Sequence, residues 1–196
     1  NQAEWITMYK NKKIGLVIPC YKVSKHINDV IKNVPNFIDK IYIVDDKCPE
    51  NSVEYIKSKS RKIKKIFRNI NGGVGAAVKQ GYRYSLKDNN FITVRIDGDG
   101  QMDLELMKYF IDPIINNKAG FTKGNRFTNL TFIRKMPNLR IVGNIFFSII
   151  GNLITKNFKI FDILNGYTSI SNRSLKKVLK TNIDNDFFFW YSFNLS

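Results

Sequence analysis

Asp97 and Asp99 flank a single glycine in the segment RIDGDGQM (95–102), directly after the apolar run FITV. In an extended chain, residues two apart project to the same side, so both carboxylates can face one ligand. Carboxylates suit Mg²⁺ or Mn²⁺, which complete their coordination with water and phosphate oxygens. The residue types and their spacing therefore indicate a divalent-metal site.

Other interpretations of this segment have to be weighed. An EF-hand loop is excluded, because Met102 and Lys108 stand where that loop needs glycine and glutamate. Asp-Gly is also a strong signal for a hairpin turn, although a helical pattern rather than a strand follows here. A plain loop between a strand and a helix capped by Asp103 stays open at this point.

Short apolar runs alternate with helical patterns along the chain, which predicts an α/β fold with a mainly parallel sheet covered on both faces. Ser24 is the expected N-cap of the first helix. The expected strands are 14–18, 40–44, 64–69, 91–96 and 120–125, and the expected helices are 24–34, 50–59, 75–87, 103–115, 138–156 and 174–180.

Polar residues follow the first four expected strands. They are Pro19 to Tyr21, then the acidic pair Asp45 and Asp46, then the segment 69–75, then Asp97 and Asp99. Ligands of parallel sheets bind at the carboxyl ends of the strands, so these groups are expected at one edge. The glycines of NGGVGAA (71–77) open a helix and suit contact with a phosphate or a ribose, although they match neither a Walker loop nor a dinucleotide fingerprint.

The composition favours an anionic partner. The chain has 196 residues, which suits one domain, and a net charge of +16. Such a charge favours nucleic acid, an anionic membrane surface or phosphorylated small molecules. Twelve of the 32 Lys and Arg residues, but only three of the 16 acids, lie in 118–196, which is therefore the more cationic part.

Two cysteines, Cys20 and Cys48, form neither a disulfide framework nor a zinc signature, so reduced thiols are expected. The first residues lack the apolar centre of a signal peptide, and the apolar stretch 145–154 is too short to span a bilayer. The aromatic run 187–196 has no closing element, so we expect one catalytic domain, residues 1–196, cut short at its carboxyl end.

Six segments occur in the order found in family 2 glycosyltransferases: VIPCYKVSKHI, IYIVDDKCPENSV, NGGVGAAVKQGY, RIDGDGQMD, KGNRF and FDILNGYTSIS. Over residues 14 to about 175 the chain resembles the branch with dolichol-phosphate mannose synthase and bacterial polyprenyl-phosphate glycosyltransferases. The resemblance implies a GT-A (Rossmann-like) fold and an inverting sugar transfer.

The resemblance also implies a role for each matching residue. Asp97 and Asp99 match the DxD motif that holds Mg²⁺ or Mn²⁺ against the donor diphosphate, and Arg126 lies near phosphate. The acid Asp162 joins these three as a catalytic residue. The donor-binding residues would be Pro19, Tyr21, Asp46, Gly73, Gly75, Asp97 and Gln101, and the acceptor side would comprise Asn165, Gly166, Arg134 and Arg140.

The sequence departs from the family pattern at the expected general base. No acidic segment occurs in 187–196, where relatives often carry one. A sugar hydroxyl needs a base, whereas a phosphate acceptor is already anionic, with a second pKa of about 6. This favours a lipid-phosphate acceptor, and Asp162, Asp184 and Asp186 remain candidates if a base is needed.

The sequence thus predicts a metal-dependent transferase that moves a sugar from a nucleoside diphosphate, UDP rather than GDP, to a polyprenyl phosphate. We expect it on the cytoplasmic face of the membrane, docked through the cationic, apolar segment 134–159. Transfer to a sugar hydroxyl of a surface glycan stays open, as does a non-catalytic nucleotide- or nucleic-acid-binding domain. Nucleic acid is disfavoured, because the basic run 57–65 has no interleaved aromatic residues.

Overall fold

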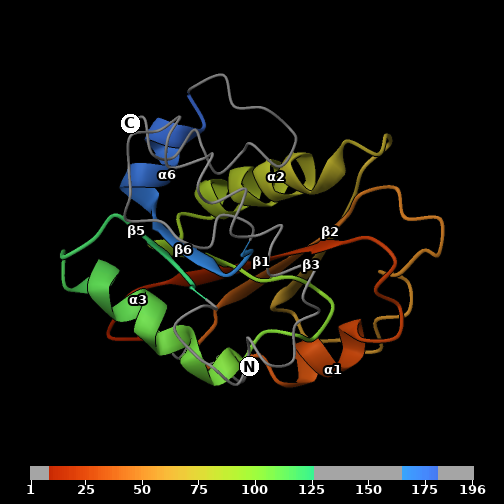
Figure 1. Ribbon diagram of the computed structural model, residues 1–196, viewed down its shortest axis with the longest axis horizontal. Helices are drawn as coiled ribbons and strands as arrows, with labels where there is room; N and C mark the ends of the chain where they lie inside the picture. Colours follow the sequence, from red (N-terminus) through yellow and green to blue (C-terminus); the bar gives the residue numbers. More distant parts are fainter. Residues whose placement is uncertain (1–8, 126–164, 181–196) are drawn as a thin grey trace, which may run out of the picture.

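The computed structural model describes residues 9–125 and 165–180. They form a six-stranded sheet with the strand order β3-β2-β1-β4-β6-β5 (Figure 1). The strands are β1 (Ile14–Cys20), β2 (Lys40–Asp45), β3 (Ile63–Phe67), β4 (Ile92–Arg95), β5 (Phe121–Lys123) and β6 (Thr168–Ser171). The helices are α1 (Ile27–Lys32), α2 (Gly73–Lys87), the 3₁₀ helix η1 (Leu104–Leu106), α3 (Met107–Ile115) and α6 (Asn172–Val178).

Strands β1 to β4 run parallel, and β6 runs antiparallel to both β4 and β5. Every residue of β1 is buried, as expected of a central strand covered on both faces. The predicted α/β fold with a mainly parallel sheet is confirmed, and β6 is the addition that the sequence analysis missed.

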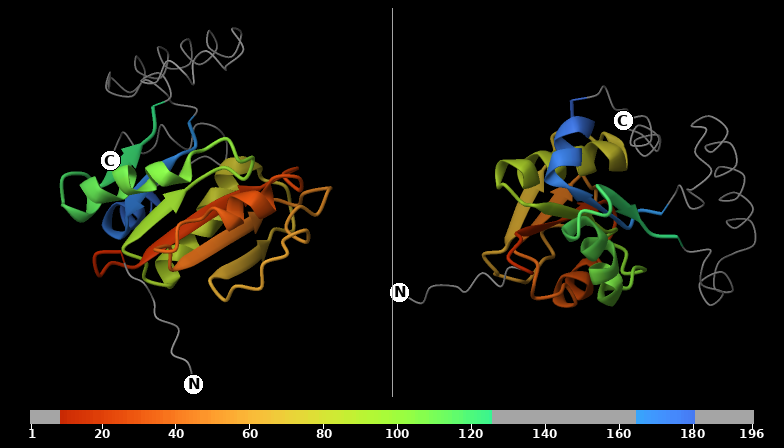
Figure 2. Two further views of the ribbon diagram at one scale, coloured as in Figure 1. Left: turned by 90° about the horizontal axis from the view of Figure 1, so that it is seen from below. Right: turned by 90° about the vertical axis from the view of Figure 1, so that its left-hand side faces the viewer.

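Helices cover both faces of the sheet (Figures 1 and 2). Helices α1 and α3 pack on one face, in a core that includes Leu16, Ile18 and Met107. Helices α2 and α6 pack on the other, in a core that includes Val17 and Tyr82. Because successive strand residues point to opposite faces, Leu16 and Val17 enter different cores.

Helix α2 packs closely on β1 at Gly81. A Cβ on Gly81 would overlap the side chain of Val17, so any larger residue at this position would force one of the two to shift. The loop after α2 is tied down by polar contacts, since Asn90 Nδ2 donates to the hydroxyl of Tyr42 over 2.7 Å and that hydroxyl donates to Asp88 Oδ2 over 2.8 Å. These contacts fix the helix whose first turn reaches the candidate site.

The helix expected over 50–59 is wrong. The structure has turns at 52–55 and no helix there. Asn51 has a left-handed backbone with φ +49°, and the Ser52 hydroxyl accepts from the backbone N–H of Val23 over 3.0 Å. Such side-chain bonds compete with helical backbone bonds.

The expected N-cap role of Ser24 is also wrong. Helix α1 begins at Ile27 after His26, which makes no side-chain capping bond, and the Ser24 hydroxyl instead donates to Glu50 Oε2 over 3.0 Å. Other boundaries shift by one to three residues, and α2 begins at Gly73 rather than at residue 75. Asp103 does cap η1, since its Oδ1 accepts from the N–H of Glu105 over 2.9 Å.

The apolar helix expected over 138–156 lies outside the described residues. Within 9–125 and 165–180, no helix is long and apolar enough to cross a membrane.

Candidate active site at the carboxyl edge of the sheet

The carboxyl ends of the parallel strands meet at one edge, as predicted. Cys20 at the end of β1 pairs with Asp45 at the end of β2, and Asp45 pairs with Phe67 at the end of β3. On the other side of β1, Arg95 at the end of β4 pairs with Val17. The segments that follow these four strands therefore lie along the same edge.

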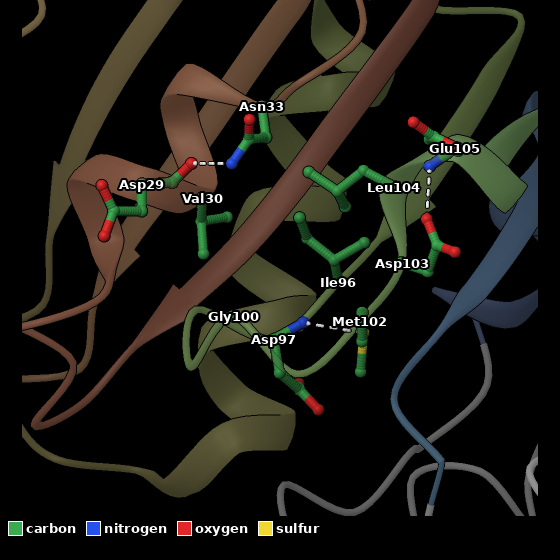
Figure 3. A pocket seen from close by; sticks show the side chains of 10 residues that line it. All are labelled: Asp29, Val30, Asn33, Ile96, Asp97, Gly100, Met102, Asp103, Leu104 and Glu105. Carbon is green, nitrogen blue, oxygen red and sulfur yellow. Dashed lines mark hydrogen bonds between the residues drawn. The ribbon is translucent and has the colours of Figure 1, made fainter. Parts of the chain in front are cut away.

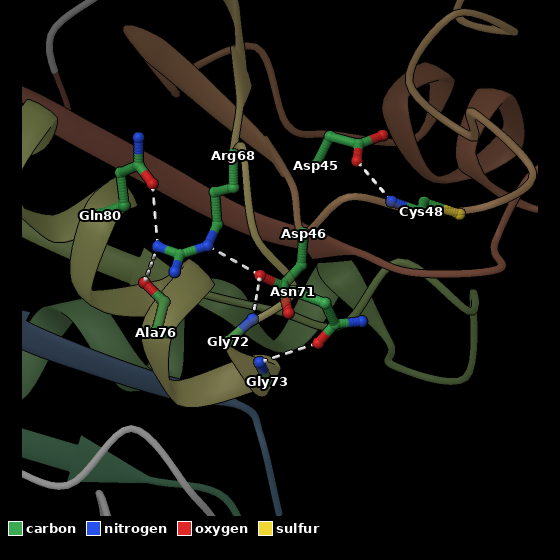
Figure 4. A network of polar contacts seen from close by, with 9 residues as sticks. All are labelled: Asp45, Asp46, Cys48, Arg68, Asn71, Gly72, Gly73, Ala76 and Gln80. Atoms are coloured by element: carbon green, nitrogen blue, oxygen red, sulfur yellow. Dashed lines mark hydrogen bonds and ion pairs between the residues drawn. The ribbon is translucent and has the colours of Figure 1, made fainter.

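Asp46 is a buried carboxylate, 4% exposed, just past the end of β2. Its Oδ1 accepts from Arg68 Nε over 2.7 Å and from the backbone N–H of Gly72 over 3.1 Å (Figure 4). Arg68 also donates to the carbonyl of Ala76 over 3.1 Å and to Gln80 Oε1 over 2.9 Å. Arg68 thus ties the end of β2 to the first turns of α2, and no described hydrogen bond uses Asp46 Oδ2.

The glycine-rich segment forms the start of α2. Gly73 has φ +80°, a conformation that favours glycine, and its N–H donates to Asn71 Oδ1 over 3.1 Å. The first turn of α2 carries no acidic residue. Because the N-terminus of a helix carries partial positive charge, this end suits an anionic group. Gly75 is buried and lies in the same first turn of α2 as Gly73.

The chain turns at Gly98 and Asp99, so the premise of an extended chain over 97–99 is wrong. Asp99 Oδ1 accepts from the backbone N–H of Gln101 over 3.1 Å, and Gly100 has φ +76°. The side chain of Gln101 is exposed. The turn keeps both aspartates in the loop that follows β4, through hydrogen bonds rather than through strand alternation.

Asp97 forms an ion pair with Arg95, whose Nη2 lies 2.5 Å from Asp97 Oδ1. Arg95 is 4% exposed, whereas the Asp97 side chain is 34% exposed. No described hydrogen bond uses Asp97 Oδ2. Within residues 9–125 and 165–180, no group of three or more His, Cys, Asp or Glu side chains is placed to coordinate a metal ion. Asp97 and Asp99 fit a cation of the Mg²⁺ type, which is commonly held by one or two carboxylates together with substrate phosphates.

The segment before β6 lies directly against Asp97. A Cβ on Gly166 would overlap both carboxylate oxygens of Asp97, and it would lie 2.8 Å from Arg95 Nη2. The neighbouring Asn165 is buried, and its Oδ1 accepts from the N–H of Tyr167 over 3.0 Å. The structure therefore brings Gly166 and its neighbour Asn165, two of the four predicted acceptor-side residues, to Asp97, although these segments are nearly 70 positions apart in the sequence.

Contacts with β5 and α3 fix this segment. Lys123 Nζ donates to the carbonyl of Asn165 over 2.5 Å, and the N–H of Gly124 donates to the carbonyl of Tyr167 over 2.9 Å. The ring of Tyr167 stacks on that of Phe110, with 4.2 Å between the centroids. Burial, and then the charge of Asp103, raise the pKa of Tyr167, which keeps its hydroxyl neutral.

A cavity of about 500 Å³ lies between α1 and the 96–105 loop (Figure 3). Its lining includes apolar side chains such as Val30 and Leu104 and several carboxylates, Asp97 among them. In Figure 3 the Asp97 carboxylate points away from the α1 side chains.

Pro19 is buried in β1, and Tyr21 just beyond it is 45% exposed. Cys20 and Cys48 are both free thiols, as predicted, and the structure buries both. Burial raises the pKa of the Cys20 thiol. Burial acts in the same direction on Cys48, but hydrogen bonds from the Ser52 hydroxyl and from backbone N–H groups outweigh it and lower the pKa of Cys48.

Four of the predicted site residues lie outside the described residues: Arg126, Arg134, Arg140 and Asp162. The same holds for the alternative bases Asp184 and Asp186 and for the segment 187–196.

The sequence analysis missed two site residues, Arg68 and Arg95. Each pairs with a predicted carboxylate through a single oxygen. Arg95 could have been noticed in the sequence, because it is the one charged residue of the segment FITVRI (91–96) directly before Asp97. Arg68 gave none, since it follows a run rich in lysine.

A model of the family described as glycosyl transferase family 2 matches residues 16–179. The chain is 30% identical over 182 residues to the UDP-N-acetylglucosamine--dolichyl-phosphate N-acetylglucosaminyltransferase of Methanococcus voltae, with 85% of this chain and 72% of that protein covered.

Solved structures support the fold. A glucosyl-3-phosphoglycerate synthase of Mycobacterium tuberculosis, solved with Mn²⁺ and uridine diphosphate, is 13% identical at a TM-score of 0.64, covering 84% of this chain and 57% of that one. A mannosyl-3-phosphoglycerate synthase of Rubrobacter xylanophilus is 16% identical at a TM-score of 0.61, covering 83% and 55%. The chain thus spans little more than half the length of these solved proteins and shares their GT-A fold.

Proposed function

The chain belongs to glycosyl transferase family 2, and from this premise we propose that it transfers a sugar from a nucleoside diphosphate to a polyprenyl phosphate. The observation that carries the proposal is the meeting of Asp46, the first turn of α2 and the 97–99 loop at one sheet edge. The catalytic domain would include the whole of 1–196.

UDP is the proposed nucleotide. Asp46 Oδ2 would accept from the N–H of a base or from a ribose hydroxyl, since Arg68 and Gly72 occupy only Oδ1. The exposed ring of Tyr21 would contact the nucleoside, beside Pro19 at the end of β1. Two relatives support this choice, because the Methanococcus enzyme is named for UDP-N-acetylglucosamine and the Mycobacterium structure holds uridine diphosphate.

Asp97 and Asp99 would hold Mg²⁺ or Mn²⁺, with Gln101 beside them. When bound, such an ion offsets the negative charge that develops on the departing diphosphate. The protein adds fixed positive charge at this point, through Arg95 behind Asp97 and through the first turn of α2. Arg126 would add more, from the sequence that follows β5.

The reaction proposed is an inverting displacement. An oxygen of the acceptor phosphate attacks the anomeric carbon of the sugar and forms the new C–O bond. The bond from that carbon to the diphosphate oxygen breaks, and its electron pair leaves with UDP. The attacking phosphate is already anionic near pH 7, so no side chain has to remove a proton. Asn165 and Gly166 would line the acceptor side, together with Arg134 and Arg140.

A polyprenyl phosphate requires contact with a membrane, and the cytoplasmic face is the proposed location. The net charge of +16 suits an anionic lipid surface. The segment 134–159 combines basic and apolar residues in its sequence and is the proposed docking element. The relative named for dolichyl phosphate supports this acceptor class.

A transfer assay tests the proposal. UDP-N-acetylglucosamine and a short polyprenyl phosphate are incubated with the protein and with Mn²⁺ or Mg²⁺, and the glycolipid is measured by mass spectrometry. We expect product with the wild type and with Glu54→Gln, an exposed acid outside the site, and none with Asp99→Ala. Transfer only to a sugar hydroxyl would overturn the acceptor assignment, and full activity of Asp99→Ala would overturn the site.

A further inference from the structure

Arg95 is an arginine inside the sheet. It is the last residue of β4, with Val17 of β1 as its partner on one side and Thr168 of β6 on the other. Thr93, two residues earlier and therefore on the same face, hydrogen-bonds Ser85 of α2 over 2.7 Å. Arg95 thus lies beneath α2 and is 4% exposed.

A buried guanidinium is rarely tolerated unless it is paired. The ion pair in this structure joins Arg95 Nη2 to Asp97 Oδ1. The backbone of Gly166 closes over the pair, because a Cβ there would overlap the Asp97 carboxylate and come within 2.8 Å of the guanidinium. The carboxylate is therefore held at one oxygen, while Oδ2 takes no described hydrogen bond.

The charge of Arg95 changes what this loop can bind. Asp97 and Asp99 alone would present a charge of −2 to a cation, and Arg95 reduces the local charge to −1. A fixed positive charge within a few ångströms repels a free cation and attracts a diphosphate. Burial strengthens both effects, because screening by water and salt is weaker there.

We propose that Arg95 is a positioning residue that holds Asp97 through Oδ1 and offsets its charge, so that the site takes up a divalent cation chiefly together with a nucleoside diphosphate. The inference rests on the proposed function, because it assumes that Asp97 and Asp99 hold the cation. It assigns a role to Arg95, for which the sequence analysis predicted none. It also predicts an order of ligand binding, in which the free cation binds weakly by itself and binds tightly only together with the diphosphate.

Two binding measurements that need no turnover test this inference. Mn²⁺ is titrated into the protein without nucleotide and followed by the electron paramagnetic resonance of the free ion. UDP is titrated by calorimetry in the presence of EDTA. Arg95→Gln keeps a hydrogen-bond donor but removes the charge, and Arg95→Lys keeps the charge.

For Arg95→Gln we expect shifts in opposite directions: Mn²⁺ binds about ten-fold or more tighter, and UDP about ten-fold or more weaker. Arg95→Lys should stay within about three-fold of the wild type in both titrations, since the positive charge is kept. A purely structural role would weaken both ligands together or change neither, and either result overturns the inference.

A second pair of variants leaves the buried arginine in place, in case Arg95→Gln does not fold. Asp97→Asn removes the negative charge that Arg95 pairs with, whereas Asp99→Asn keeps that ion pair, although each variant removes one carboxylate charge. We expect Asp97→Asn to bind UDP in EDTA at least about five-fold more tightly than Asp99→Asn does, and equal affinities overturn the inference. If the wild type does not bind UDP even with Mn²⁺, both the proposed function and this inference are wrong. If the wild type binds UDP with Mn²⁺, the comparison of the variants tests the inference alone.

Discussion

At the scale of single residues, the site rests on two ion pairs that each leave one carboxylate oxygen open. Arg68 and Gly72 hold Asp46 through Oδ1, and Arg95 holds Asp97 through Oδ1. An ionised carboxylate fixed at one oxygen keeps its orientation, and the other oxygen remains free to accept from a ligand or to bind a cation. The paired arginines therefore prepare the carboxylates before a substrate arrives.

Arg68→Ala should weaken UDP binding and lower stability together. The substitution removes the bonds to Asp46, Ala76 and Gln80 and leaves a buried carboxylate without its charge partner. We expect the free energy of unfolding in urea to fall by about 2 kcal/mol and UDP affinity to fall by about ten-fold or more.

The control is Arg83→Ala, which removes an exposed arginine of α2 and should change neither quantity. Wild-type UDP affinity in folded Arg68→Ala would contradict the role given to Asp46.

Gly166→Ala should disturb the metal site without replacing either predicted metal ligand. The added methyl group meets the Asp97 carboxylate and the Arg95 guanidinium, so one of the two has to move. We expect a loss of about 1–3 kcal/mol in stability and a loss of Mn²⁺-dependent UDP binding. In an Asp97→Ala background the stability cost should be smaller, and an equal cost in both backgrounds would refute the contact.

At the scale of secondary-structure elements, α2 connects the core to the site. Its first turn carries Gly73 and Gly75, its middle packs on β1 through Gly81, and the loop after it is fixed by Asn90 and Asp88. The position of the first turn at the sheet edge therefore depends on the close approach of α2 to β1.

Gly81→Ala should lower the stability of the protein, although the same change stabilises most helices. Alanine in place of glycine in a helix interior normally adds about 1 kcal/mol of stability. Here the new methyl group overlaps Val17, so we expect urea denaturation to show a loss of about 1–3 kcal/mol. Combining Gly81→Ala with Val17→Ala should cost less than the sum of the two single changes, and strict additivity would contradict the predicted overlap.

Periodicity and turn residues were enough to predict the four parallel strands and the edge at which their polar residues meet. They failed for residues 50–59, where side-chain bonds replace a helix, and for β6, which is four residues long and includes the buried polar residues Thr168 and Ser169. The contact between Gly166 and Asp97 joins distant segments, so no local pattern could give it. Asp46, Asp97 and Asp99 follow their strands at this edge as predicted, but a turn rather than an extended chain joins the last two, and the roles of all three stay predictions.

At the scale of the whole molecule, charge is the dominant property. A net charge of +16 on 196 residues should attract the protein to anionic lipid surfaces. We expect sedimentation with vesicles of phosphatidylcholine and phosphatidylglycerol, and little with phosphatidylcholine alone. Raising the ionic strength from about 0.1 M to about 1 M shortens the Debye length from about 10 Å to about 3 Å and should release the protein.

Equal binding to both kinds of vesicle, unchanged by salt, would argue against an electrostatic membrane contact. It would leave the acceptor class to be decided by the transfer assay alone.

The most direct test of the central claim is a calorimetric titration of UDP and of GDP into the protein, with and without Mn²⁺. We predict that UDP binds in the presence of Mn²⁺, that Asp99→Ala abolishes this binding, and that the exposed-acid variant Glu54→Gln retains it. Binding of GDP instead would correct the donor and keep the site. Binding of neither nucleotide by the folded wild type would contradict the claim that the carboxyl edge of this sheet is a metal-dependent donor site.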